Sequence, residues 1–175
     1  MSVALFVPCY VDQLYPQVAR ATLAVLEARG VKVEYPLAQT CCGQPMANAG
    51  CEGDAHAAAR RFVRTFAGYD TIVAPSGSCV QYVRHHFDAL PQTPQVQEVR
   101  SRTVELSEFL LTLPDGPPID FPYRVGVHVG CHALRGLRQA TASELGPTPG
   151  GALRTLLARL RGAEVVPLDR PDECC

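Results

Sequence analysis

Residues 3–9 read VALFVPC, an apolar run that ends in a proline and a cysteine. Polar and apolar residues do not alternate in this run, which is typical of a strand buried on both faces of a sheet. Pro16 then suits the start of a helix, and Gly30 suits its end. Between them apolar residues recur at helical spacing, at Leu14, Val18, Ala21, Val25 and Leu26. The sequence therefore predicts a strand, a cysteine and a helix, in that order.

The alternation of strand and helix continues along the first two thirds of the chain. Apolar patterns predict strands at 31–35 and 71–74, and helices at 54–66 and 80–88. After a predicted loop that includes 91–94, a further helix is predicted at 104–113. Strands that alternate with helices favour a parallel sheet with right-handed crossovers.

The first pattern returns after the linker-like stretch PDGPP at 114–118. A strand is predicted at 124–129 and ends at Gly130-Cys131, a helix follows at about 151–161, and a strand at 163–168 leads to Cys174-Cys175. The order strand, cysteine, helix, glycine, strand, Cys-Cys thus occurs twice, which indicates an internal repeat.

The fold class predicted from this repeat is α/β, with two Rossmann-like repeats that contain parallel sheets and are related by a pseudo-two-fold axis. The predicted domains are 1–115 and 116–175. The chain stops inside the second motif, so the second repeat is expected to be incomplete at its C-terminal end.

Composition excludes several classes of function. The chain has 175 residues, 47% of them apolar, and a formal net charge of -1, so no basic field is expected to attract nucleic acid or anionic lipid. A basic leader and an apolar run of about 20 residues are both missing from the sequence, so we expect a cytoplasmic protein without a membrane span. Eight cysteines in a reducing compartment indicate metal or redox chemistry before disulfides.

The cysteines of the first repeat follow the carboxyl ends of predicted strands. In a parallel sheet these ends share one edge, outside which ligands bind. The same edge presents helix N-termini, which stabilise thiolates and lower thiol pKa values. We therefore expect convergence of four cysteines that are distant in sequence: Cys9, Cys41, Cys42 and Cys79.

Four thiolates suit either tetrahedral zinc or an iron–sulfur cluster. Structural zinc commonly takes two short C-x2–4-C hooks, whereas the spacings here are Cys9-x31-Cys41, an adjacent Cys41-Cys42 pair, and Cys42-x36-Cys79. Two adjacent thiolates fit poorly on one small ion and more easily on a multi-iron cluster, so the spacing favours iron. A zinc-stabilised structural or assembly module without redox activity is the alternative. A thiol-redox protein is disfavoured because these positions form no C-x-x-C.

The pattern Cys9-x31-Cys41-Cys42-Gly43-x35-Cys79, followed by Cys131-x42-Cys174-Cys175, resembles the duplicated CCG (cysteine-rich) domain family. That family includes a cysteine-rich component of heterodisulfide reductase and the iron–sulfur subunit of glycolate oxidase. The stretches CCGQP at 41–45 and PSGSC at 75–79 are most similar to its lactate-utilisation subgroup. The resemblance implies a noncubane [4Fe-4S] cluster, electron transfer, and partner subunits of an L-lactate, glycolate or related 2-hydroxy-acid oxidising complex.

The resemblance also implies which residues hold the cofactor. The first site would use Cys9, Cys41, Cys42 and Cys79, and the second would use Cys131, Cys174 and Cys175. Ser76 stands where the family has the earlier cysteine of a C-x-x-C, so a cubane, another nuclearity or a labile cluster are open alternatives. Cys51 lies outside the pattern and is interpreted as a small residue at a helix start. No catalytic acid–base residue is assigned, and the chain is expected to be a redox subunit of an oxidoreductase.

Overall fold

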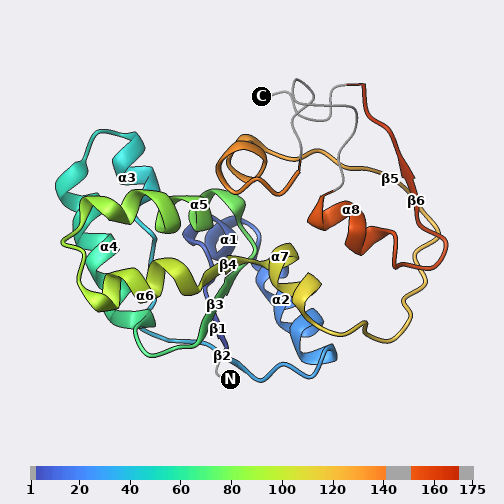
Figure 1. Ribbon diagram of the computed structural model, residues 1–175, viewed down its shortest axis with the longest axis horizontal. Coiled ribbons are helices and arrows are strands. Elements are labelled where there is room, and N and C mark those ends of the chain that lie inside the picture. Colours follow the sequence, from blue (N-terminus) through green and yellow to red (C-terminus); the bar gives the residue numbers. More distant parts are fainter. Residues whose placement is uncertain (1–2, 141–150, 170–175) are drawn as a thin grey trace. The chain divides into compact units, whose positions relative to one another are not determined.

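The computed structural model describes residues 3–140 and 151–169, and the chain divides into two compact units, Met1–Leu106 and Ser107–Cys175. Figure 1 shows helices around a central group of strands in the first unit. The second unit is smaller and contains a pair of strands. None of the helices in the described part of the chain combines the length and the apolar character that crossing a bilayer requires.

The first unit is built on a four-stranded sheet with the order β2-β1-β3-β4, in which every neighbouring pair is parallel. Its strands are β1 (Val3–Leu5), β2 (Val33–Glu34), β3 (Thr71–Ala74) and β4 (Thr103–Glu105). Val3 lies opposite both Val33 and Thr71, so β1 sits between β2 and β3. The predicted α/β class with a parallel sheet is confirmed.

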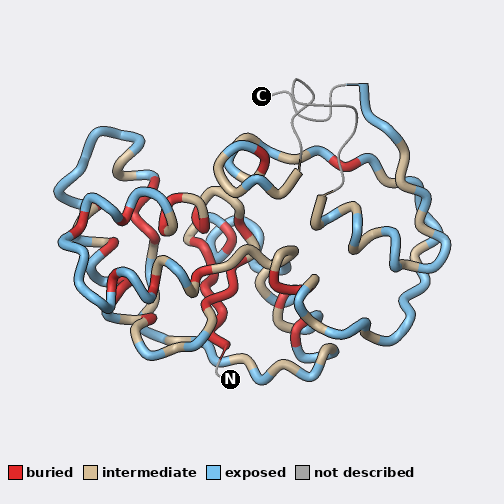
Figure 2. The backbone as a smooth tube through the Cα atoms, viewed as in Figure 1, coloured by how far each residue is buried: buried red, intermediate tan, exposed pale blue. Residues whose placement is uncertain are grey.

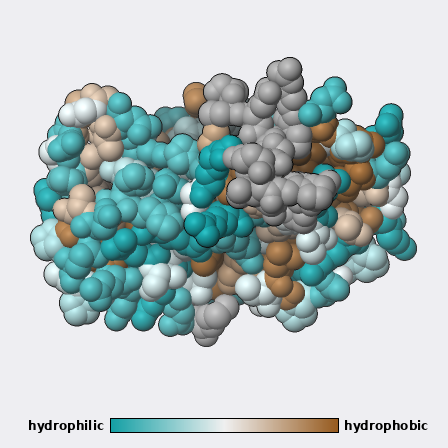
Figure 3. Space-filling model, turned by 45° about the horizontal axis from the view of Figure 1, so that its top comes forward, coloured by the Kyte–Doolittle hydropathy of each residue, from teal (hydrophilic) through white to brown (hydrophobic). Residues whose placement is uncertain are grey.

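Helices follow the strands and cover the sheet. They are α1 (Cys9–Leu14), α2 (Pro16–Ala28), α3 (Gln44–Asn48), α4 (Glu52–Phe66), α5 (Gly77–His86), the 3-10 turn η1 (Phe87–Ala89) and α6 (Pro94–Arg102). The helix α7 (Leu106–Thr112) begins at the last residue of this unit and continues into the second. In Figure 1, α4 and α6 lie on one side of the strands and α2 lies on the other. Over α3 to α6, the face of the unit seen in Figure 3 is mostly hydrophilic.

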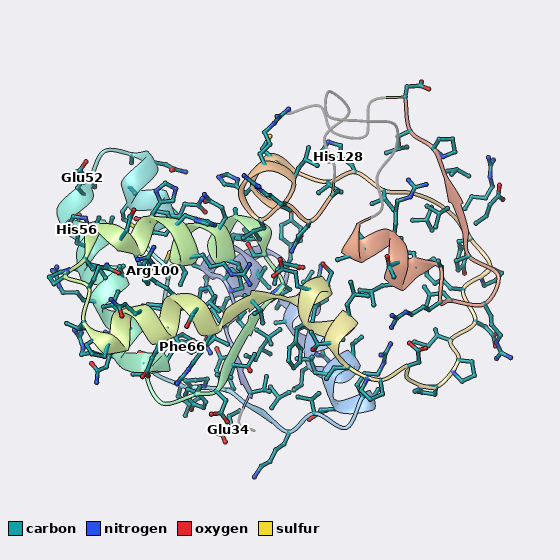
Figure 4. The ribbon with its side chains drawn as sticks, in the orientation of Figure 1. Glu34, Glu52, His56, Phe66, Arg100 and His128 are labelled. Atoms are coloured by element: carbon teal, nitrogen blue, oxygen red, sulfur yellow. The ribbon has the colours of Figure 1, made fainter. Side chains whose placement is uncertain are left out.

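The core forms where successive residues of the first strand point to opposite faces of the sheet. Leu5 and Val7 form a buried cluster with Val11, against which Ala19 and Leu23 of α2 pack. On the other face Phe6 is fully buried, and its ring centroid lies 4.9 Å from that of Phe62 and 5.6 Å from that of Phe66 on α4. Figure 2 shows buried residues in the strands and along one side of the helices that pack on them, and Figure 4 labels Phe66.

The face that α2 turns to the sheet differs from the stripe of recurring apolar residues in its sequence. Thr22 and Leu26 are buried, whereas Val18 and Val25 are exposed, and Leu14, which ends α1 before this helix begins, is 68% exposed. Ala19 and Leu23 of α2 pack against the buried cluster of Leu5, Val7 and Val11, so the packed face includes a small residue that the recurring apolar stripe left out.

The helix predicted at 104–113 is wrong in its first part. Thr103–Glu105 forms the strand β4, in which Thr103 lies opposite Ile72 of β3, and α7 begins only at Leu106. Backbone pairing with β3 therefore outweighs the helical pattern of the sequence. The helix α6 was not predicted. It begins at Pro94, and the side chain of Thr93 caps it by accepting a hydrogen bond from the Val96 N–H at 3.4 Å.

The second unit contains two short parallel strands and short helices. β5 (Arg124–Gly126) pairs with β6 (Glu164–Val166), with Val125 opposite Val165. The π-helix η2 (His132–Gly136) follows Cys131, and α8 (Ala152–Leu157) precedes β6. The order of strand, helix and strand agrees with the predicted repeat. A pseudo-two-fold relation between the repeats, and the division at residue 115, stay predictions.

Candidate metal centre

Two cysteines of the candidate site, the first and the last along the chain, follow neighbouring strands. Cys9 is the first residue of α1, after β1, and Cys79 lies in the first turn of α5, after β3. The chain goes from β1 to β2 on one side and returns to β3 on the other, so the strand order reverses between β1 and β3. Open α/β sheets bind ligands beside the carboxyl ends of their strands at such a point.

The Cys41-Cys42 pair reaches the same place on a loop that the side chain of Gln39 ties to the first strand. Gln39 Oε1 accepts a hydrogen bond from the Val7 N–H at 2.8 Å, and Gln39 Nε2 donates to the Leu5 carbonyl oxygen at 3.1 Å. The Cys41 Sγ lies 3.3 Å from the Cys9 Sγ. Two cysteines separated by 32 positions are thus in contact.

Gly43 is needed where the loop turns into α3. Its φ is +102°, in the region that favours glycine, and a Cβ at this position would lie 2.7 Å from the carbonyl oxygen of Ala55 on α4. Its N–H points to the site and donates to the Cys41 Sγ at 3.4 Å. A glycine at this position therefore allows the sharp turn that brings the cysteine pair to the site.

The four thiols form one continuous set. Cys42 is hydrogen-bonded to both Cys41 and Cys79, and Cys41 is hydrogen-bonded to Cys9. Cys42 and Cys79 are only 1% and 4% exposed, whereas Cys9 and Cys41 are half-buried. The structure therefore brings together all four cysteines for which the sequence predicted convergence.

Hydrogen bonds within this set divide the thiols into donors and acceptors. The Cys42 thiol lowers the pKa of Cys41 to about 5 and also lowers the pKa of Cys79. Burial, followed by the interactions with Cys41, raises the pKa of Cys9 to about 11. Hydrogen bonds to Cys41 and Cys79 raise the pKa of Cys42. The arrangement thus favours thiolates at Cys41 and Cys79, each beside a thiol that can donate to it.

Ser76 is the N-cap of α5, directly before its first residue, and is buried. Its hydroxyl oxygen accepts a hydrogen bond from the Cys79 N–H at 3.4 Å, and it lies 3.3 Å from the Ser78 hydroxyl oxygen. The Ser76 hydroxyl also helps to lower the pKa of Cys79. Ser76 therefore caps the helix and contacts a cysteine of the site.

Two residues near the thiols were not predicted from the sequence. Tyr82 is buried one turn after Cys79 on α5, and its pKa is raised by burial and then by the charges of Cys42 and Cys41. Helical spacing from Cys79 could have indicated Tyr82. Nothing in the local sequence indicated Gln39, because its role depends on a strand more than 30 positions away.

The remaining cysteines lie outside this set. Cys51 is exposed and precedes α4, as its interpretation as a residue at a helix start predicted. Cys131 lies in the second unit, half-buried at the start of η2, and Figure 4 labels the nearby His128. Cys174 and Cys175, the other cysteines assigned to the second site, lie outside the described residues.

The donor set is chemically suited to a soft metal. Each of the six cysteines in the described ranges is a free thiol, and thiolates select zinc, copper(I) and iron–sulfur clusters. In 3–140 and 151–169, no three His, Cys, Asp or Glu side chains are arranged as ligands of a single metal ion.

Comparison with known proteins finds one matching family and relatives that share one name. The model of a cysteine-rich domain family, CCG, matches residues 3–84 and 125–175. Three relatives are each called lactate utilization protein A, and each alignment covers all of this chain and 72% of the relative. They come from Geobacillus thermodenitrificans (35% identical), Geobacillus kaustophilus (36%) and Shouchella clausii (34%).

Proposed function

This chain belongs to the CCG family of cysteine-rich domains, and on that premise we propose that it is an iron–sulfur electron-transfer subunit of a cytoplasmic lactate-oxidising system. The observation that carries the proposal is the continuous set of four thiols at the switch point of the sheet. The relatives' name supports the role in lactate utilisation.

The residues present fit an iron–sulfur cluster. Four thiols meet, two of them deeply buried, and a backbone N–H at Gly43 already donates to one sulfur. Cys9, Cys41, Cys42 and Cys79 would hold the cluster, which we take to be [4Fe-4S], of the noncubane type that the family resemblance implies or a cubane. When bound, such a cluster stores and releases one electron at a time.

The protein's own groups control the charge of this site. Hydrogen bonds to sulfur and the positive end of α5 stabilise negative charge, whereas burial of Cys42 and Cys79 opposes it. Both effects set the potential of a cluster. The chain would therefore tune and shield the electron carrier.

We assign the dehydrogenation of L-lactate, or of a related 2-hydroxy acid, to partner subunits of the complex, and the acceptance of electrons to this chain. A second cluster would use Cys131 together with Cys174 and Cys175. If the proposal is correct, replacing Cys42 by serine in the host's gene should abolish growth on L-lactate but not on glucose. Normal growth on L-lactate would contradict the role in lactate use.

Metal analysis of the anaerobically purified full chain tests the cofactor. We expect about four iron and four sulfide for each filled site, together with an EPR signal after reduction. About one zinc for each chain, with no iron after anaerobic reconstitution, would instead favour the zinc-stabilised module.

Two variants separate the site from the other thiols. Cys42→Ala removes the thiol that is hydrogen-bonded to two others, and it should abolish the EPR signal of the first site. Cys51→Ala removes an exposed thiol outside the set and should leave the signal unchanged. An unchanged signal in Cys42→Ala would show that the proposed ligand set is wrong.

A further inference from the structure

The first strand has one edge that its neighbour does not complete. On the β3 side, the Phe6 N–H donates to the Val73 carbonyl oxygen at 2.9 Å. Backbone groups of successive residues in an extended chain point to opposite edges, so those of Leu5, the last residue of β1, and of Val7, two residues later, point to the β2 side. β2 ends at Glu34, which lies opposite Ala4. Leu5 and Val7 are buried but lie beyond the end of β2.

Gln39 takes the place of the missing strand. Its single planar amide accepts from the Val7 N–H at 2.8 Å and donates to the Leu5 carbonyl oxygen at 3.1 Å. A buried N–H or carbonyl without a partner is costly, so both bonds favour this position of the side chain. The amide therefore continues the edge of the sheet across a gap in β2.

The position of this amide matters because each of the two segments that it joins leads directly to a cysteine of the set. Gln39 lies two residues before Cys41, and Val7 lies two residues before Cys9. The hydrogen bond from Val7 thus joins the two segments two residues before each of the sulfurs that lie 3.3 Å apart, and the bond to Leu5 holds the same amide one step further back along the strand. The exposed Arg61 also holds this loop, through its Nε and the Ala38 carbonyl oxygen at 3.3 Å, but that bond does not reach the strand.

We infer that Gln39 is a positioning residue that sets the separation of the Cys9 and Cys41 sulfurs. The inference rests on the proposed function only in treating these sulfurs as cluster ligands. The positioning itself is a property of the metal-free chain.

Disulfide formation in the metal-free full chain measures this positioning directly. Diamide oxidises two thiols to one disulfide, takes up their two hydrogen atoms and becomes a hydrazine. Mass spectrometry of protease digests then gives the rate at which the Cys9–Cys41 disulfide forms. Gln39→Met keeps the length of the side chain but removes both hydrogen bonds, and we expect the rate to fall about tenfold, which corresponds to about 1.4 kcal/mol.

Three further variants make the result specific. Gln39→Glu keeps the acceptor for the Val7 N–H and loses the donor to Leu5, so its rate should be intermediate. Arg61→Met loosens the same loop without touching β1, and Gln95→Met makes the same replacement at an exposed site on α6. Both controls should keep the wild-type rate, and circular dichroism confirms that each variant is folded.

A folded Gln39→Met with the wild-type rate would overturn the inference, as would an equal loss of rate in Arg61→Met. If Gln39→Met does not fold, a wild-type rate in Gln39→Glu would also overturn it. Anaerobic reconstitution then separates the two proposals. Absence of iron from the wild type contradicts the cluster but leaves the disulfide result valid. Where the wild type does bind iron, we expect a lower iron content and an altered EPR signal in Gln39→Met, and wild-type values in Gln95→Met.

Discussion

Replacing Gly43 by alanine tests whether the turn after the cysteine pair requires glycine for two separate reasons. The first reason is the backbone, because φ is +102° at Gly43. The second is space, because an added Cβ would lie 2.7 Å from the Ala55 carbonyl oxygen. Gly50 offers a matched control: its φ is +77°, but a Cβ there would have nothing within 4 Å.

The two reasons predict different losses of stability. A non-glycine residue in this backbone region costs about 1–3 kcal/mol. Overpacking against backbone costs about 1–3 kcal/mol more. Gly43→Ala should therefore lower the free energy of unfolding by about 2–6 kcal/mol, and Gly50→Ala by about 1–3 kcal/mol, because only the first cost applies to it. Domains have about 5–15 kcal/mol in total, so the larger loss approaches unfolding.

Urea unfolding of the metal-free protein, followed by far-ultraviolet circular dichroism, measures both losses. The displaced loop in Gly43→Ala should also lose the hydrogen bond from residue 43 to the Cys41 sulfur, and reconstituted iron should fall with it. Equal losses of stability in Gly43→Ala and Gly50→Ala would refute the argument from space. In that case α4 would simply move away from the turn.

Two further predictions concern the electrostatics of the thiols. Ser76→Ala removes a helix cap and should lower the free energy of unfolding by about 1 kcal/mol. It should also raise the pKa of Cys79, which is measured from the rate of alkylation at different pH values. Thr93→Ala removes an equivalent cap on α6 and should leave the pKa of Cys79 unchanged. The pKa of Cys41 is lowered from 9.0 to about 5. Its thiolate should therefore stabilise the metal-free protein fully above pH 9 and progressively less as the pH falls towards 5. The difference in urea midpoint between wild type and Cys41→Ala, followed over this pH range, measures the effect. The pH dependence for Cys9 is the opposite, because its pKa is raised to about 11. Its contribution to stability should be complete below pH 9 and lost as the pH rises through 11. A difference between wild type and Cys41→Ala that does not change with pH would contradict the lowered pKa of Cys41.

Local sequence patterns were sufficient to predict the helices and strands whose own apolar residues form their buried face. The strand at Thr71–Ala74 has the predicted bounds, and its residues are almost all buried. A helix was predicted at 54–66 and runs from Glu52 to Phe66, and it buries an apolar face that includes Ala55, Ala59 and Phe62. The prediction of a helix that includes 104–105 was wrong because the edge strand Thr103–Glu105 is defined by its pairing with β3, and its own sequence also suits a helix.

The convergence of Cys9, Cys41, Cys42 and Cys79 followed from the sequence, because cysteines placed after parallel strands must reach one edge of the sheet. The contacts at that edge required the folded chain. The pairing of Cys9 with Cys41, the amide of Gln39 beside Val7, and the approach of Gly43 to Ala55 all join segments through packing. The periodicity of a sequence shows which side of a helix or strand is apolar. It does not show which backbone atom, distant in sequence, will form a hydrogen bond with a given side chain.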